Sequence, residues 1–342
     1  MATGSGLDGQ IGFAQETTWG TAVTVTRFPE FNSEGVSLDT TWLEPTALRP
    51  GVYHKRGGRA QPSRYSVQGD FELDLVTLGM GMFMRNALGS TTATTTLIAG
   101  SAYKQIHVPG GFVGLGLTAQ VGRPQPNGTV IPFTYAGCKI PKWELSLKDN
   151  ATPKLKFTID GKSESTATAL ATPSYLTGAT VFTFRQASLK LGGTAATASG
   201  ETTITGGVAP TTIIKDISIA GANPMADDRY GIGNAGLKAE QLQNATPTIT
   251  GKLGAEFNKT EFYDVYSAGT PTCLQFDLTG AVIGGANSYL FSVILPMVKF
   301  KKATPQVTGP DIVQMSTDFE AYSDEVNPVI QVKIVSTEAT AV

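Results

Sequence analysis

Residues 142–160 read KWELSLKDNATPKLKFTID, and this stretch indicates the fold class most directly. Its two halves, 142–148 and 154–160, each alternate apolar side chains with polar or charged ones. A period of two is typical of a strand with one buried face. Asp149-Asn150 supplies turn chemistry between the halves. The stretch therefore predicts an antiparallel β-hairpin.

The same alternation recurs on both sides of this hairpin. It is found in Tyr65–Leu73, with an interruption at Gly69, and in Val329–Val335 near the C-terminus. The chain contains 39 Gly and 19 Pro and is rich in Thr. β-Branched residues favour strands, and Gly and Pro mark the turns between them. The sequence thus predicts a mainly β protein and argues against a helical bundle.

Two stretches depart from the alternation and are expected to form short helices. Asp74–Leu88 has spaced apolar residues after an Asp that is positioned to cap a helix. Asn258–Ala268 begins with Asn258 and has Glu261 three residues later, the spacing of a capping box. Each expected helix directly follows an expected strand.

The order of elements repeats along the chain. A strand, a long loop, a second strand, a helix and a closing hairpin occur twice, with weak similarity between 67–73 and 249–257. We interpret this as a tandem duplication into two β-sandwich or barrel domains, residues 1–165 and 175–342, each with one short helix. The alternative is chance self-similarity in a β-rich chain. The Ser/Thr/Ala-rich stretch Ser163–Tyr175 is expected to link the domains.

Composition and charge exclude several classes of protein. The 342 residues include 26 Lys+Arg, 28 Asp+Glu and 2 His, a formal net charge of −2, and only 16% are charged. This balance argues against a nucleic-acid binder held by a net positive field. The apolar runs are too short to span a bilayer, and the N-terminus lacks the pattern of a secretory signal. Cys138 and Cys273 fit a reducing cytoplasm better than a disulfide scaffold, and the sequence leaves open one bridge between them or no role for either.

The sequence nominates no catalytic residue, cofactor site or metal site. His54 and His107 stand alone, without partners at metal-ligand spacing. Asp227-Asp228 is a candidate for acid–base work or cation binding, but adjacent acids in a loop are more often a solvated tip. We therefore do not expect an enzyme.

One charged cluster stands out in the first long loop. Residues 49–64 contain five basic residues and no acid, with Gly57-Gly58 expected at the tip of the loop; the basic residues are Arg49, Lys55, Arg56, Arg59 and Arg64. Contact with nucleic acid and docking onto an acidic protein face are the two functional interpretations. The slightly acidic chain favours protein docking.

The N-terminal segment is the most specific motif. Residues 11–23 read IGFAQETTWGTAV, and residues 27–31 read RFPEF. This segment resembles the N-terminus of one group of bacteriophage tail tube (major tail) proteins of long-tailed phages. The resemblance covers roughly the first tenth of the chain, and the β-rich Thr/Gly/Ala composition agrees with it.

The resemblance implies a fold, an assembly and partners. Two tail-tube-like domains would form rings whose inner strands join into a continuous β-barrel, and stacked rings would form the conduit for genome DNA. The loop 41–62 and its counterpart 223–247 would reach the adjacent ring, with the five basic residues, Asp227 and Asp228 as inter-ring contacts. Three copies with pseudo-six-fold symmetry are favoured for a ring, and six remain an alternative. Tape measure and tail terminator proteins are the further partners, with assembly in the host cytoplasm and the virion tail as the final location.

Other functions remain open on fold class alone. A carbohydrate-binding or adhesin-like β-sandwich would need an aromatic platform or calcium carboxylates, and neither is visible in the sequence. A secretion-system tube protein is normally only one domain long. A β-rich hydrolase is disfavoured because no nucleophile and base can be paired.

Overall fold

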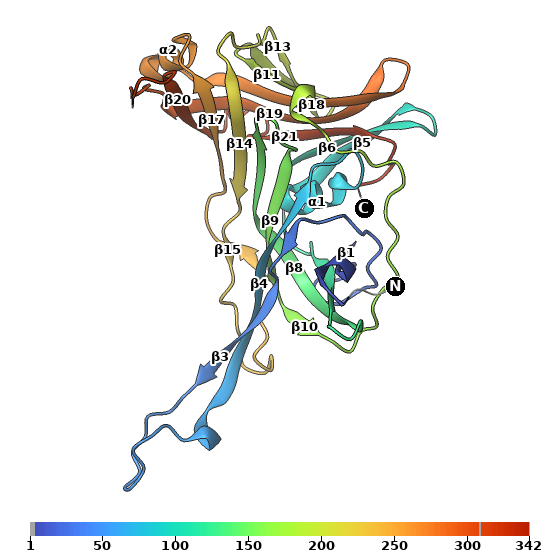
Figure 1. Ribbon diagram of the computed structural model, residues 1–342, viewed down its shortest axis with the longest axis vertical. Helices are drawn as coiled ribbons and strands as arrows, with labels where there is room; N and C mark the ends of the chain where they lie inside the picture. The colour runs from blue at the N-terminus through green and yellow to red at the C-terminus, as the bar shows by residue number, and fades with distance from the viewer. Residues whose placement is uncertain (1–3, 308, 342) are drawn as a thin grey trace.

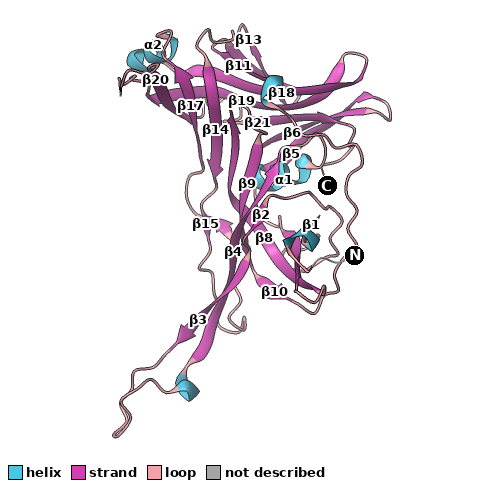
Figure 2. Cartoon of the chain, viewed as in Figure 1, coloured by secondary structure: helices cyan, strands magenta, loops and turns pink. Residues whose placement is uncertain are grey.

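The computed structural model describes residues 4–307 and 309–341 of the chain. Strands dominate, and the described residues contain two α-helices and three short 3-10 turns, Gly6–Asp8, Gly57–Arg59 and Phe184–Gln186 (Figures 1 and 2). One group of strands runs along the long axis, a second group crosses it at one end, and a narrow arm projects from the other end (Figure 1). The prediction of a mainly β protein is confirmed.

A run of eight antiparallel strands forms what we call the long sheet. In spatial order its strands are β3 (Ser37–Leu43), β4 (Gln61–Asp74), β9 (Lys154–Gly161), β8 (Val130–Lys148), β14 (Ile214–Ala222), β17 (Thr248–Glu256), β20 (Gln314–Ala321) and β19 (Asn287–Lys302). A short strand, β2 (Ser33–Glu34), also pairs with β4. The first four strands come from the N-terminal half of the chain and the last four from the C-terminal half.

Two further groups of strands share β8 and β19 with the long sheet. The first group contains β1 (Gln10–Gln15), β7 (Leu117–Pro124), β8 and β10 (Ser163–Ser165). The second contains β11 (Ala187–Leu191), β18 (Thr272–Gly284), β19, β21 (Gln331–Ser336), β6 (Ala102–Pro109) and β5 (Gly89–Ile98). Small ladders are β12 (Thr194–Ala198) with β13 (Glu201–Thr205), and β15 (Met225–Ala226) with β16 (Leu242–Gln243).

The two longest strands change sheets at a proline. β8 pairs with β7 up to Cys138 and with β14 from Lys142, and Pro141 lies between. β19 pairs with β21 up to Ile294 and with β20 from Val298, and Pro296 lies between. Since proline has no N–H, the ladder is interrupted there and the strand can bend from one sheet into the next.

Both expected helices form, but the first begins later than predicted. α1 spans Met80–Leu88, and Asp74, the expected cap, is instead the last residue of β4. Its carboxylate accepts a hydrogen bond from Asn32 Nδ2 at 3.0 Å. The residue before α1 is Gly79, with a φ of 82°, and its N–H donates to Glu338 Oε2 at 2.5 Å. A distant carboxylate therefore replaces the local cap.

The predicted capping box of the second helix is wrong for the same reason. α2 spans Glu261–Ala268, and its N-cap Thr260 makes no side-chain capping bond. The Glu261 carboxylate accepts the N–H of Thr212 at 2.6 Å, and Asn258 Nδ2 donates to Thr211 O. Both side chains stabilise a neighbouring loop, because tertiary partners compete with the local capping bonds.

Aromatic packing attaches both helices to the same face of the long sheet. The ring of Phe83 in α1 lies 5.4 Å from that of Phe157 and 5.7 Å from that of Phe71. The ring of Phe262 in α2 lies 5.5 Å from that of Phe300. The core therefore lies between the long sheet and the helices and crossing strands, which leaves the opposite face to polar residues.

Three of the strands inferred from alternation lie within β4, β8 and β9, and the fourth, Val329–Val335, overlaps β21, which begins at Gln331. The expected linker begins with β10, whose three residues pair with β8. The next residues are held by Gln120, whose Nε2 donates to Ala169 O at 3.0 Å and whose Oε1 accepts the N–H of Ala171 at 2.8 Å. Among the described helices, none is long and apolar enough to cross a membrane.

Candidate assembly surfaces

The first long loop extends away from the body of the molecule. We call residues 44–60 the arm; β3 and β4 continue into it on either side (Figure 1). Nearly all of its side chains are exposed. Its sharp turn lies at Arg49–Val52, where the N–H of Val52 donates to Arg49 O at 3.2 Å. The expectation of a tip at Gly57-Gly58 is wrong, because these residues form a 3-10 turn beside β4.

The structure divides the five predicted basic residues between two environments. Arg49, Lys55 and Arg59 are exposed on the arm and Arg56 is half-buried; Lys55 pairs with Glu44. Arg64 lies on β4, with its guanidinium 4.8 Å from the centre of the Tyr230 ring. The arm alone is thus the charged projection, and Arg64 contacts the second long loop of its own chain.

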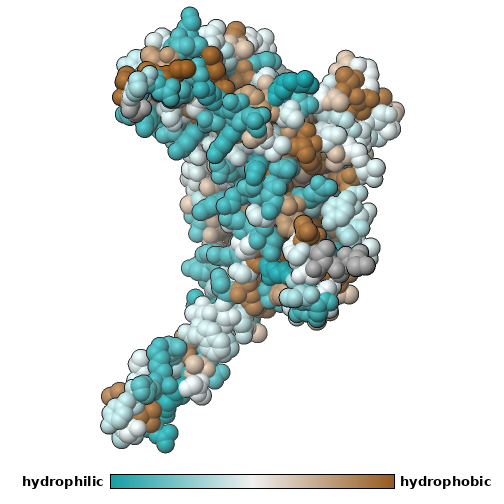
Figure 3. Space-filling model, in the orientation of Figure 1, coloured by the Kyte–Doolittle hydropathy of each residue, from teal (hydrophilic) through white to brown (hydrophobic). Residues whose placement is uncertain are grey.

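The arm also exposes apolar residues that the charge pattern did not indicate. Leu48 is 99% exposed and Tyr53 is 92% exposed, and Trp42 at the end of β3 is 57% exposed. Large exposed apolar side chains on a projection are typical of a protein contact. Figure 3 shows this mixture of hydrophilic and hydrophobic residues along the arm.

The second long loop, 223–247, folds back onto the long sheet instead of projecting. Lys238 is buried and forms an ion pair with Asp160 of β9. Lys139 of β8 is also buried, and its Nζ donates to Glu240 Oε1 at 2.7 Å and to Gln241 O at 2.8 Å. These two buried lysines hold the loop in place.

Burial dominates the electrostatics of these anchors. It raises the pKa of the Asp160 carboxyl, although Lys238 opposes the shift. It also lowers the pKa of Lys139, although Glu240 opposes that shift. Nothing in the spacing of these residues along the sequence indicated that they meet.

Asp227 and Asp228 lie on the same loop and are exposed. No described basic side chain forms an ion pair with either of them. The structure therefore does not bring them together with the basic residues of the arm within one chain. The interpretation as a cation site has no support, since the described residues contain no group of three His, Cys, Asp or Glu placed to hold a metal.

The polar face of the long sheet carries interleaved charges. Cross-strand ion pairs join Lys156 to Asp70 at 2.7 Å, and Lys154 to Glu72 at 2.7 Å. In the C-terminal half, Lys252 lies 3.8 Å from Asp318, and Lys301 lies 3.3 Å from Glu320. Figure 3 shows much of the surface over β4, β9 and β14 as hydrophilic. The face has no block of one charge sign.

The N-terminal motif forms a buried clamp. Glu16 is 4% exposed, and its carboxylate accepts the N–H of Gly20 at 2.6 Å and the N–H of Gly137 at 2.8 Å. The Thr118 hydroxyl donates to the same carboxylate at 3.0 Å. Gly20 has a φ of 76°, a left-handed conformation that favours glycine. The Glu16 carboxylate of the E-x-x-x-G motif thus holds the turn that ends at Gly20 against β7 and β8.

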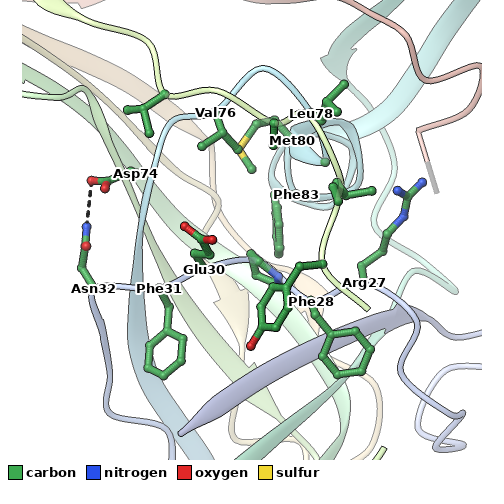
Figure 4. A pocket seen from close by; sticks show the side chains of 16 residues that line it. Arg27, Phe28, Glu30, Phe31, Asn32, Asp74, Val76, Leu78, Met80 and Phe83 are labelled. Atoms are coloured by element: carbon green, nitrogen blue, oxygen red, sulfur yellow. Dashed lines mark hydrogen bonds between the residues drawn. The ribbon is translucent and has the colours of Figure 1, made fainter. Parts of the chain in front are cut away.

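A cavity of about 250 Å³ lies between the N-terminal segment, α1 and residues 175–181. Phe28, Phe31, Met80 and Phe83 surround it, and the Glu30 carboxylate faces it (Figure 4). Its lining includes no histidine, cysteine, serine or lysine that could pair with that carboxylate as nucleophile and base. Most of the lining is apolar, and Arg27, Asp74 and Tyr175 are its other charged or phenolic side chains.

The two thiols and one of the two imidazoles are buried, whereas His54 is exposed on the arm. Cys138 and Cys273 are both buried and unbridged. Burial raises the pKa of each thiol, which disfavours the reactive thiolate. His107 is buried on β6, and its Nδ1 lies 3.0 Å from Thr91 Oγ1.

Comparison with known proteins identifies the family. Among curated proteins, no sequence matches the chain. The family model described as phage tail tube protein matches residues 6–321, nearly the whole chain. The chain therefore belongs to the phage tail tube protein family, whose members are structural subunits that assemble into the tube of the virion tail.

Proposed function

We propose that copies of this chain close into rings around a bore lined by the polar face of the long sheet, and that stacked rings form the conduit for genome DNA. One observation carries the proposal: the long sheet is apolar and covered on one face, polar on the other, and open at both edge strands. Pairing open edges between copies satisfies their backbone groups and closes a barrel. Interleaved charges on the wall would let a duplex pass without strong attachment.

We further propose that residues 1–165 and 175–342 are two tube domains and that three chains make one ring. Two observations support the duplication. β4 pairs with β3 and β9 as β17 pairs with β14 and β20, and each helix follows the equivalent strand. The flanking groups of strands repeat in the same way. β7 pairs with β1 and β8, and β18 pairs with β11 and β19.

The width of the bore favours three copies over six. With ~4.8 Å between neighbouring strands, three long sheets of eight strands give a backbone ring ~37 Å across, before strand tilt widens it. Six copies would give ~73 Å by the same estimate. The smaller ring still admits a duplex once side chains line it, and it leaves less empty space.

We propose that the arm contacts the adjacent ring, with Arg49, Lys55, Arg56 and Arg59 facing acidic residues of the next copy. Arg64 assists by holding the second loop, and Asp227 and Asp228 are the exposed acids of that loop. The exposed Leu48 and Tyr53 support a protein contact. The tape measure protein in the bore, the tail terminator at the tube end and assembly in the host cytoplasm complete the proposal. The protein would act without catalysis.

Electron microscopy of the purified chain at increasing concentration tests the proposal. We expect hollow tubes. Averaged cross-sections should show three copies per ring and a tube wall with approximate six-fold symmetry. Six copies per ring would contradict the role proposed for the duplication, while leaving the tube itself intact. A chain that stays monomeric at every concentration would contradict the function proposed here, and glycan binding by that monomer would favour an adhesin.

A further inference from the structure

The long sheet ends in two strands that each have an open edge. β3 pairs only with β4 among the described strands. At the other end, residues 299–302 of β19 pair with β20 on one side, and the partner on the other side, β18, begins at Thr272 opposite Val298. Within the described chain nothing continues the ladder past either edge.

Hydrogen bonding shows which backbone groups face these edges. Antiparallel pairs alternate between bonded and non-bonded residues. The N–H of Gly35 donates to Asp70 O at 2.8 Å, so the same register directs the backbone groups of Leu38 and Thr40 away from β4. On β19, Met297 O accepts the N–H of Tyr322 at 2.9 Å, which directs the groups of Phe300 to the open side.

The chain already contains one junction between the strands equivalent to these. β8, the last strand of the first four, pairs with β14, the first strand of the second four, over residues 142–148 and 216–222. Trp143, Leu145, Ile217 and Ile219 are buried along this junction. β3 holds the place beside β4 that β14 holds beside β17, and β19 holds the place beside β20 that β8 holds beside β9.

We propose that the open edge of β3 in one copy pairs antiparallel with residues 299–302 of β19 in the next copy, as a repetition of the β8–β14 junction. The inference rests on the proposed function, because it supplies the contact that closes the ring. The partner is a second copy of this chain. Every junction in the ring would then be of one kind, half of them within chains and half between chains.

Charge complementarity supports the choice of partner strand. Asp39 lies exposed on the polar face of β3, and Lys299 and Lys301 lie exposed on the polar face of β19. Within the chain, lysines of one strand already face acids of the next, as Lys156 faces Asp70. Pairing β3 with β3 would instead bring two copies of Asp39 together, and like charges across strands are destabilising.

Thr40→Pro tests the β3 edge directly. Its N–H faces the open side, so proline removes a donor that the folded chain does not use, and edge strands tolerate proline at such positions. We expect a monomer with the far-ultraviolet spectrum and unfolding midpoint of the wild type that no longer forms rings. Thr40→Val, which keeps the N–H, should assemble normally. Normal tubes from Thr40→Pro would overturn the inference and leave the proposed function standing, whereas absence of tubes from the wild type would count against the function itself.

Cross-linking provides a second test that does not depend on loss of assembly. A Thr41→Cys, Lys301→Cys double variant, treated with a short bismaleimide after tube formation, should give a ladder of covalent oligomers that ends at the number of copies in a ring. The native cysteines are buried and leave the background low. Neither single variant should give a ladder. Dimers from Thr41→Cys alone would show β3–β3 pairing and contradict the proposal, and so would a double variant that stays uncross-linked in intact tubes.

Discussion

His107 is fully buried on β6, and burial, with the nearby Arg85 charge, lowers its pKa to about 3 from an ordinary value of 6.5. The unfolded chain therefore binds a proton between these two pH values that the folded chain does not bind. Protonation of this residue does not reduce the unfolding free energy above pH 6.5, and it reduces it progressively as the pH falls toward 3.

We expect His107→Asn to make the chain less sensitive to acid. Between these two pH values, the histidine lowers the unfolding free energy by about 1.4 kcal/mol for each unit by which the pH falls, and an asparagine at this position does not. Urea unfolding of unassembled chain at several values between pH 7 and pH 4.5 measures the difference in slope. Carboxylates contribute equally to both proteins, so identical slopes would show that His107 is not the responsible group.

At the scale of elements, two long loops at equivalent places differ in what their residues contact. The loop 223–247 is held by buried lysines, while the arm is solvated. Removing one partner of a buried ion pair leaves a charge without compensation. The anchored loop should therefore depend strongly on Lys238.

We expect Lys238→Met to lower the unfolding free energy by about 3–5 kcal/mol, because Asp160 would remain buried and unpaired. The double variant with Asp160→Leu should recover much of this loss, since both charges are then absent. Denaturant unfolding of the two variants and the wild type gives the comparison. A single variant as stable as the wild type would show that the pair does not anchor the loop.

The sequence predicted those strands and helices in which one face is buried and the other is exposed, because only these give a periodic pattern of apolar residues. Alternation located parts of β4, β8, β9 and β21, but it could not show that β8 extends back to Val130. Residues 130–133 are half-buried on both faces and residues 134–140 are buried on both faces, so neither stretch alternates. The start of α1 was displaced because Glu338, far along the chain, contacts the N–H before the helix, and that of α2 because Glu261 and Asn258 bond to a neighbouring loop. Local spacing cannot report such distant contacts.

The assembly surfaces were predictable to a similar extent. The charge run indicated an exposed loop but placed its tip at the wrong residues, and the packing of Arg64 on Tyr230 depends on a loop that is distant in sequence. The Lys139 and Lys238 anchors gave no signal, because a lysine side chain is normally solvated. The Glu16 motif indicated the family, and only the structure shows why its carboxylate is buried.

At the scale of the whole molecule, body and arm are separable. The body contains the core and both open edges, and nearly all residues of the arm are exposed. Interactions that close a ring and interactions that stack rings should therefore respond to different changes.

We expect replacement of residues 44–60 by an Asn-Gly turn, between Leu43 and Gln61, to leave folding and ring closure intact and to abolish stacking. Arg56→Glu with Arg59→Glu should shorten the tubes or prevent them, while Arg56→Lys with Arg59→Lys should not. Sedimentation velocity and electron microscopy distinguish single rings from tubes. Full-length tubes from the deletion would show that the arm does not join rings.

The continuous connection through Ser163–Tyr175 has a kinetic consequence. A tethered pair meets at a high effective concentration, so the β8–β14 contact forms without a diffusional encounter. In the proposed ring of three chains, the rate of ring closure would depend on the third power of the chain concentration, whereas six separate domains would give a sixth-power dependence. Under the proposed function, this tether would let ring closure begin at a lower concentration of the chain.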